Sequence, residues 1–197
     1  MTGIVLAGGR NLRMGRDKAA LPWQGADFLH TILQRLSTVC SELIVVTNNP
    51  APDIIDGVRY VSDIIPGCGP LSGIHAGLHY ASSPISFVIA CDMPFVQPAA
   101  VSWLFSQAQG WDAVIPIEAT FTEPLFACYA KTCIPYIELL LRQDIRKTQR
   151  LIQLIRCKSI SLNDLRPFDP DLKLLRNINS PTDYQAALSE IGQPPVL

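Results

Sequence analysis

A glycine-rich segment with nearby cations follows the first apolar run of the chain. Gly8 and Gly9 come directly after the run at Gly3–Ala7, and Arg13 and Lys18 lie a few residues further on. Glycines after a strand let backbone N–H groups turn towards an oxyanion, and the two cations suit the charge of a triphosphate. The GxxxxGK[ST] and GxGxxG patterns are absent, which argues against a P-loop ATPase or a dinucleotide dehydrogenase. The alternative is an ordinary glycine-rich turn with solvated charges.

Acidic residues stand at the ends of two further apolar runs. Asp92 follows the run at Ile85–Cys91, and Asp63 follows Arg59–Ser62 and precedes the glycine-rich Pro66–Gly73. Ligands in open α/β sheets bind outside the carboxyl ends of the strands, so we expect Asp92 to face the same crevice as the glycine segment. Magnesium prefers one or two carboxylates with phosphate oxygens and water, which makes Asp92 the candidate metal ligand. The alternatives are an Asp that caps a turn and glycines that only permit tight packing.

The elements that position these residues alternate between short apolar runs and helical stretches. This alternation predicts an α/β fold, with a mostly parallel, twisted sheet flanked by helices. The 197 residues favour one domain over residues 1–197. The last helix has the clearest start, because Ser180 can cap it and Asp183 completes a capping box. We predict strands at Gly3–Ala7, Glu42–Thr47, Arg59–Ser62, Ile85–Cys91, Asp112–Ile117, Pro124–Ala130 and Leu174–Ile178, and helices at Asp27–Cys40, Leu71–Ala81, Ala99–Gln109, Lys131–Arg142, Ile145–Ile155 and Pro181–Ile191.

Composition narrows the class of protein. A formal net charge of −1 gives no global attraction to nucleic acid or to an anionic membrane, so we expect neither as a partner. The N-terminus lacks a basic region before its apolar run, which argues against a signal peptide and favours the cytoplasm. The six cysteines have no CxxC spacing, and we expect most of them to be buried, reduced thiols.

Several segments together resemble the molybdenum cofactor guanylyltransferases. These enzymes belong to the nucleotidyltransferases with a Rossmann-like fold, similar to that of the nucleotide-diphospho-sugar transferases. The resemblance lies in Leu6–Pro22, which contains a glycine pair followed by RMGRDK, in GPLSGIHAG at Gly69–Gly77, in CDMP at Cys91–Pro94 and in NINSPTD at Asn177–Asp183. The first and third of these segments are the most specific.

The resemblance implies a role in GTP binding and catalysis for residues that match the family pattern. Lys18, Asp92 and Arg13 would be catalytic, and Asp92 would ligate Mg²⁺. The residues that would bind GTP are Leu6, Ala7, Gly8, Gly9, Lys18, Asp63 and Asp92.

The resemblance also implies residues for the acceptor. Asn179 is similar to a position that completes the metal site or the acceptor site, with Asn177 beside it. Glu123, with the Pro and Leu that follow it, resembles a family segment that lines the acceptor pocket.

Two segments match the family pattern less well. Thr47-Asn48-Asn49 follows the second strand, and the polar nucleotide contact there falls on Thr47 or on either Asn. The basic stretch around Arg146 matches weakly, so its role in binding the acceptor phosphate stays open. A solvated charged face is the alternative for that stretch.

The implied reaction transfers GMP from GTP to the terminal phosphate of molybdopterin and releases pyrophosphate. The substrates would be GTP and molybdopterin, with further proteins of cofactor biosynthesis as partners. A relative that uses CTP or a sugar phosphate is the nearest alternative, although the glycine pair favours GTP. A non-catalytic carrier of molybdopterin or nucleotide is the alternative of another class, and it would not need Asp92.

Overall fold

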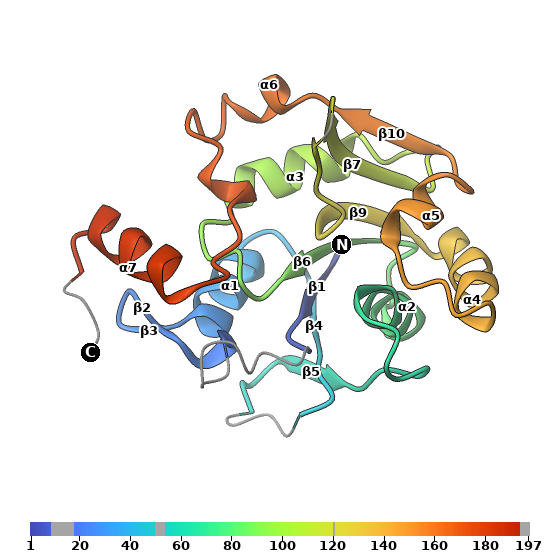
Figure 1. The fold of residues 1–197 in the computed structure, drawn as a ribbon, viewed down its shortest axis with the longest axis horizontal. Coiled ribbons are helices and arrows are strands. Elements are labelled where there is room, and N and C mark those ends of the chain that lie inside the picture. The colour runs from blue at the N-terminus through green and yellow to red at the C-terminus, as the bar shows by residue number, and fades with distance from the viewer. Residues whose placement is uncertain (9–17, 50–53, 120, 194–197) are drawn as a thin grey trace.

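A central sheet with helices on both faces forms the fold (Figure 1), and the computed structural model describes residues 1–8, 18–49, 54–119 and 121–193. The strands are β1 (Thr2–Leu6), β2 (Pro22–Trp23), β3 (Ala26–Asp27), β4 (Glu42–Val46), β5 (Val58–Val61), β6 (Ile85–Ala90), β7 (Ala113–Glu118), β8 (Phe121–Thr122), β9 (Phe126–Ala130) and β10 (Cys157–Ile160). The α-helices are α1 (Phe28–Ser37), α2 (Pro70–Tyr80), α3 (Pro98–Ser106), α4 (Ile134–Arg142), α5 (Thr148–Ile152), α6 (Leu162–Leu165) and α7 (Pro181–Glu190). Short 3₁₀ turns occupy Lys18–Ala20, Lys131–Cys133 and Lys173–Leu175.

The sheet is mostly parallel. Its strands lie in the order β10-β7-β9-β6-β1-β4-β5, and β8 pairs with β7 beside this path. β1 runs parallel to both β4 and β6, and β4 runs parallel to β5. β9 is antiparallel to its neighbours β6 and β7. The predicted α/β class with a mostly parallel sheet flanked by helices is therefore confirmed.

Alternating side chains of the central strands bury both faces of the sheet. On β1, Ile4 and Leu6 join one buried cluster, and Val5 joins the other. β4 shows the same alternation, with Ile44 on the face of Ile4 and Val45 on the face of Val5. Because successive residues of a strand point to opposite faces, these apolar runs require helices on both sides.

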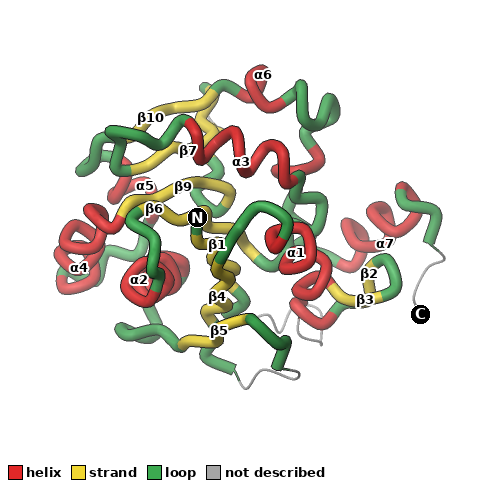
Figure 2. Tube along the Cα trace, turned by 180° about the vertical axis from the view of Figure 1, so that it is seen from behind, coloured by secondary structure: helices red, strands yellow, loops and turns green. Residues whose placement is uncertain are grey.

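The helices divide between the two faces. Residues of α1 and α3 belong to the cluster around Val5, and residues of α2, α4 and α5 belong to the cluster around Ile4. Figure 2 shows α1 and α3 on one side of the strands and α2 and α4 on the other.

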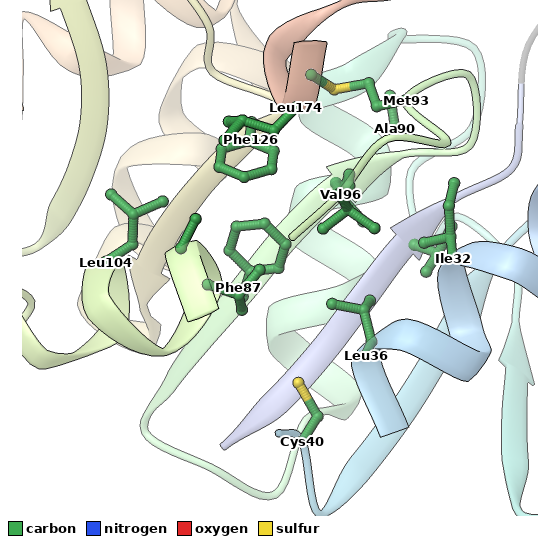
Figure 3. Packing of buried hydrophobic residues seen from close by; sticks show 14 of the residues in the cluster. Ile32, Leu36, Cys40, Phe87, Ala90, Met93, Val96, Leu104, Phe126 and Leu174 are labelled. Carbon is green, nitrogen blue, oxygen red and sulfur yellow. The ribbon is translucent and has the colours of Figure 1, made fainter. Parts of the chain in front are cut away.

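Aromatic and aliphatic side chains fill the layer between α1, α3 and the sheet. Figure 3 shows Ile32 and Leu36 of α1 on one side of Phe87, and Leu104 of α3 on the other. Phe87 and Phe126, from the adjacent strands β6 and β9, meet edge to face with ring centroids 5.1 Å apart. This geometry is favourable for aromatic pairs, and it fills the layer with two large apolar rings.

The C-terminal helix α7 packs at one end of the molecule. Together with the β2–β3 hairpin it forms a third buried cluster, which includes Trp23, Phe28 and Tyr184. The predicted capping box at its start is present, because the Ser180 hydroxyl accepts from the Asp183 N–H and the Asp183 carboxylate accepts from the Ser180 N–H. The capping box therefore fixes the position at which α7 begins, directly after the segment that contains Asn177 and Asn179.

One predicted element was wrong and one was too long. The segment predicted as a strand at Leu174–Ile178 instead makes a 3₁₀ turn at Lys173–Leu175. Leu174 and Leu175 join the buried cluster between α1, α3 and the sheet, Ile178 joins the cluster of α7, and β10 occupies the edge of the sheet beside β7. The helix predicted over Ile145–Ile155 is present but shorter, as α5 at Thr148–Ile152, and the chain turns at Asp144, which has φ +56°. No helix among the described residues has the length and apolarity needed to cross a bilayer.

The close approach of α2 to β1 requires a glycine at position 77. A Cβ atom at Gly77 would lie 2.5 Å from Cγ2 of Ile4 and 2.9 Å from its Cδ1. Ile4 is fully buried and β-branched, so it cannot turn away. We predict that Gly77→Ala lowers the free energy of unfolding by about 1–3 kcal/mol, as overpacking does, although alanine is the better helix former. Urea denaturation would measure this change.

A double-mutant cycle provides the control. Ile4→Ala alone should lower the free energy of unfolding by about 2–5 kcal/mol through the cavity that it leaves. The Ile4→Ala/Gly77→Ala variant should lose less than the sum of the two single changes, because the new methyl group enters that cavity. A Gly77→Ala variant as stable as the wild type would contradict this account of the contact.

Candidate functional site

A pocket of about 820 Å³ lies where the central parallel strands end. Its walls include Leu6 at the end of β1, Val46 at the end of β4 and Ala90 at the end of β6. The position agrees with the rule that open α/β sheets bind ligands beyond the carboxyl ends of their strands. Strand direction therefore brings distant parts of the sequence to one site.

Backbone hydrogen bonds hold these strand ends together beyond the last paired residues. The Ala7 N–H donates to the Val46 carbonyl at 2.9 Å, and the Cys91 N–H donates to the Leu6 carbonyl at 3.1 Å. The pocket floor is therefore a continuation of the sheet. Groups carried on it are fixed more firmly than groups on a free loop.

Asp63 and Asn48 form a reciprocal pair on the pocket wall. The Asn48 side chain donates from Nδ2 to Oδ2 of Asp63 at 2.7 Å, and the Asp63 N–H donates to Oδ1 of Asn48 at 3.0 Å. Partial burial raises the pKa of Asp63, and the hydrogen bond from Asn48 and the charge of His75 oppose that rise. The pair joins the chain after β4 to the chain after β5 and presents polar atoms to the pocket.

The N-terminus of α2 contributes the adjoining wall. Gly69 and Pro70, where the helix begins, and Gly73 in its first turn all line the pocket. Gly69 has φ +69°, a conformation that residues with a Cβ rarely adopt. The positive end of the helix dipole therefore lies at the pocket, which favours a bound anion such as a phosphate.

Asp92 is tied to the C-terminal segment that carries two asparagines. The backbone carbonyl of Asp92 accepts from the Ile178 N–H at 2.8 Å, and Ile178 is fully buried. Asn177 and Asn179, on either side of Ile178, line the pocket as Asp92 does. A residue that follows β6 and two residues from the far end of the sequence thus share one wall.

Glu123 lies behind this wall in a buried position. Its carboxylate accepts from the Leu125 N–H at 3.1 Å and from the Asn177 side chain at 3.0 Å. Burial raises the pKa of Glu123 and the nearby charge of Asp92 adds to the rise, whereas the two donors oppose it. The predicted contact of Glu123 with the acceptor substrate stays a prediction. In the structure its carboxylate binds Asn177, which lines the pocket.

Arg146 brings positive charge to the pocket. Its guanidinium pairs with Asp144, with 2.9 Å between Nε and Oδ1. Among the described residues that line the pocket, it is the one cationic side chain. The sequence left the role of Arg146 open. The chain turns at Asp144, just after the end of α4, and Arg146 follows this turn on the pocket wall.

Most of the predicted site residues that the structure describes lie at this pocket. Ala7 is buried beneath it in the core. Gly9 and Arg13 lie outside the described residues, as does the side chain of Lys18, so their roles stay predictions. The pocket-lining predicted residues are Leu6, Gly8, Asp63, Asp92, Asn177 and Asn179.

The segment after β4 lies at the pocket as a whole. Thr47, Asn48 and Asn49 all line it. Which of the three contacts a nucleotide therefore stays open. Leu125, two residues after Glu123 in the segment expected at the acceptor, lines the pocket as well.

Sequence reasoning missed two side-chain contacts of the site. The pairing of Asn48 with Asp63 was one, although both residues follow predicted strands. That shared placement after neighbouring parallel strands was the signal that could have joined them. The contact of Glu123 with Asn177 was the other, and nothing in the spacing of these two residues signals it.

A family match covers most of the chain. The family described as "MobA-like NTP transferase domain" matches residues 3–160, which include the central strands and α2. The chain belongs to this family. The match ends before Asn177 and Asn179, so the C-terminal part of the pocket rests on the structure.

Curated relatives match almost the whole chain. A probable molybdenum cofactor guanylyltransferase of Pelotomaculum thermopropionicum is 37% identical over 186 residues, covering 94% of this chain and 91% of the relative. The molybdenum cofactor guanylyltransferase of Desulfosudis oleivorans is 32% identical, covering 97% of this chain and 96% of the relative. These matches extend the likeness into the C-terminal segment.

Solved structures share the fold. Molybdopterin-guanine dinucleotide biosynthesis protein A of Archaeoglobus fulgidus superposes with a TM-score of 0.83 at 28% identity, covering 98% of this chain and 99% of that one. The 2-C-methyl-D-erythritol 4-phosphate cytidylyltransferase of Thermus thermophilus superposes with a TM-score of 0.71 at 15% identity, covering 96% and 98%. The second likeness shows the fold alone.

The Asn48–Asp63 pair gives a prediction that depends on pH. Asn48→Asp replaces a donor with a second carboxylate, so we expect the free energy of unfolding to fall by about 1 kcal/mol at pH 7. Repulsion raises the pKa of the carboxyl pair in the folded state, so the folded variant binds more protons than the unfolded chain. The loss relative to wild type should therefore shrink as the pH falls from 7 towards 5. Urea denaturation at both pH values measures it.

Asn49→Asp is the matched control, because it adds the same charge one residue away at an exposed position. It should change the free energy of unfolding by less than about 0.5 kcal/mol at either pH. Equal effects of the two substitutions would show that the pairing with Asp63 contributes nothing specific.

Proposed function

We propose that this chain transfers GMP from GTP to the terminal phosphate of molybdopterin, with release of pyrophosphate. The observation that carries the proposal is the wall of Asp92, Asn177 and Asn179 in a pocket at the strand ends. The names of the whole-chain relatives support the choice of reaction. The proposed product is the guanine dinucleotide form of the cofactor.

The pocket has the size and polarity for a nucleotide. Its volume of about 820 Å³ falls in the range of small-molecule sites, about 300–1,000 Å³. The N-terminus of α2 and the guanidinium of Arg146 favour phosphate groups. The carboxylate of Asp63 accepts hydrogen bonds, as the N–H groups of guanine or the hydroxyls of ribose would require.

The donor set at Asp92 fits Mg²⁺ shared with a substrate. Groups of three or more His, Cys, Asp or Glu side chains that could hold a metal are absent from the described part of the chain, so an all-protein cage does not fit. Mg²⁺ instead binds through one or two carboxylates together with phosphate oxygens and water. Asp92 would supply the carboxylate and Asn179 an amide oxygen. The bound ion would neutralise charge that develops on the phosphates.

The chemical step needs no covalent enzyme intermediate. A phosphate oxygen of molybdopterin forms a bond to the α-phosphorus of GTP, and the bond from that phosphorus to the bridging oxygen of the β-phosphate breaks. Pyrophosphate leaves with the electron pair. Such transfers depend on in-line positioning and charge neutralisation. We assign the positioning to the Gly8 backbone and α2, and charge neutralisation to Lys18 and Arg13.

Asp92→Asn tests the proposal with little change in shape. Loss of the carboxylate charge should lower the kcat of pyrophosphate release from GTP and molybdopterin at least about a hundredfold, while the Tm stays within a few degrees of wild type. A coupled pyrophosphate assay and thermal melting should be run on the same preparation.

Asp56→Asn is the matched control, since Asp56 is exposed and is not among the residues that line the pocket. Its turnover should equal that of wild type. A folded Asp92→Asn variant that keeps more than a tenth of wild-type turnover would remove Asp92 from the metal role. A wild-type chain that binds both substrates without releasing pyrophosphate would contradict the proposed reaction.

A further inference from the structure

Glu123 makes a buried contact that the proposed reaction does not use directly. The residue is 8% exposed and lies between β8 and β9. Its Oε1 accepts from the Leu125 N–H at 3.1 Å, and its Oε2 accepts from Nδ2 of Asn177 at 3.0 Å. Each carboxylate oxygen thus accepts one hydrogen bond. One donor stands two residues away in sequence, and the other lies near the C-terminus of the chain.

The contact sets the orientation of the Asn177 amide. An asparagine side chain carries a donor NH₂ at one end and an acceptor oxygen at the other. The NH₂ end of Asn177 is bound to Glu123, so the oxygen Oδ1 points away from that carboxylate. Asn177 also lines the pocket, and of its two amide ends Nδ2 is the one that Glu123 binds.

The surrounding backbone holds both partners in place. The residue after Asn177 donates its N–H to the Asp92 carbonyl at 2.8 Å. On the other side, the Leu125 carbonyl accepts from the Ala90 N–H at 3.1 Å. Glu123 and Asn177 are thus each tied to the end of β6, although they stand 54 residues apart in sequence.

We propose that Glu123 is a positioning residue, which fixes the Asn177 amide so that its oxygen is presented to the substrate bound beside Asp92. The inference rests on the proposed guanylyl transfer for its functional consequence. Without Glu123 the amide can rotate and offer its NH₂ group instead. A donor in place of an acceptor would leave a hydrogen-bonding group of the bound substrate unmatched.

Glu123→Gln reverses this hydrogen-bond pattern while it keeps the shape. The Leu125 N–H is a fixed backbone donor, so the oxygen of the introduced glutamine must face it and the glutamine NH₂ must face Asn177. Asn177 then turns its own oxygen towards that NH₂ and its own NH₂ towards the pocket. We expect kcat/KM for guanylyl transfer to fall about tenfold to a hundredfold, with an unchanged fold by circular dichroism.

A second substitution should restore the pattern. Asn177→Asp alone places two carboxylates against each other and should be as impaired as Glu123→Gln. In Glu123→Gln/Asn177→Asp, the NH₂ of the introduced glutamine can donate to one oxygen of the introduced aspartate, which leaves the other oxygen for the pocket. We expect kcat/KM to recover to within about fivefold of wild type, a coupling that only interacting residues show. Glu123→Gln/Asn179→Asp is the matched control and should not recover.

A readout without substrate separates this inference from the proposed function. In the ¹⁵N-labelled protein, the Asn177 side-chain protons should exchange slowly with solvent, and Glu123→Gln should shift their resonances. A double variant as impaired as the single ones, in a folded protein, would overturn the positioning role. If the wild type shows no guanylyl transfer, the proposed function fails, and fast-exchanging Asn177 protons that ignore Glu123→Gln would overturn the inference as well.

Discussion

The common direction of β6, β1, β4 and β5 is the constraint on which the rest of the structure depends. Parallel strands end at one edge, so the residues that follow each strand meet there whatever their separation in sequence. Backbone hydrogen bonds beyond the last paired residues keep those ends together, from Ala7 to Val46 and from Cys91 to Leu6. The two apolar layers hold the strands in this order, because both faces of the sheet are buried. Packing far from the pocket therefore determines the geometry of the site.

Two carboxylates at or near the pocket, those of Asp63 and Glu123, are each partly or fully buried and each hydrogen-bonded to an asparagine. Asp63 and Glu123 both lose solvation, which raises the pKa of each side chain. Each also accepts from an asparagine side chain, Asn48 for Asp63 and Asn177 for Glu123. A buried polar group costs little free energy only when its hydrogen bonds are made. The two asparagines thus keep the acids in fixed orientations at the site.

Position along the chain made much of the site predictable. Asp63 and Asp92 each follow a predicted strand. Because parallel strands end at the same edge of a sheet, the sequence alone placed both residues at the edge where the pocket lies. The resemblance to a known family then added Asn177 and Asn179, which line the pocket. The tie between Glu123 and Asn177 was not predictable, because it depends on the path of the chain between β10 and α7.

The strand that was wrongly predicted and the strand that was missed, β10, share a physical cause. Leu174–Ile178 has the apolar content of a strand, but its apolar side chains pack into two buried clusters without pairing in the sheet. Cys157–Ile160, with Lys158 and Ser159 in the middle, has a weak pattern and still forms β10 at the edge beside β7. Short edge strands need few apolar residues, since only their neighbour and one face constrain them. Tertiary packing therefore decides between such segments.

Identification of the product formed from mixed nucleotides is the most direct test of the central claim. The wild-type chain would be incubated with molybdopterin, Mg²⁺ and equal concentrations of GTP and CTP, and the products would be identified by mass spectrometry. The account predicts the guanine dinucleotide as the main product, together with an equimolar amount of pyrophosphate. A product that carries mainly CMP, or bound nucleotide without any pyrophosphate, would contradict it.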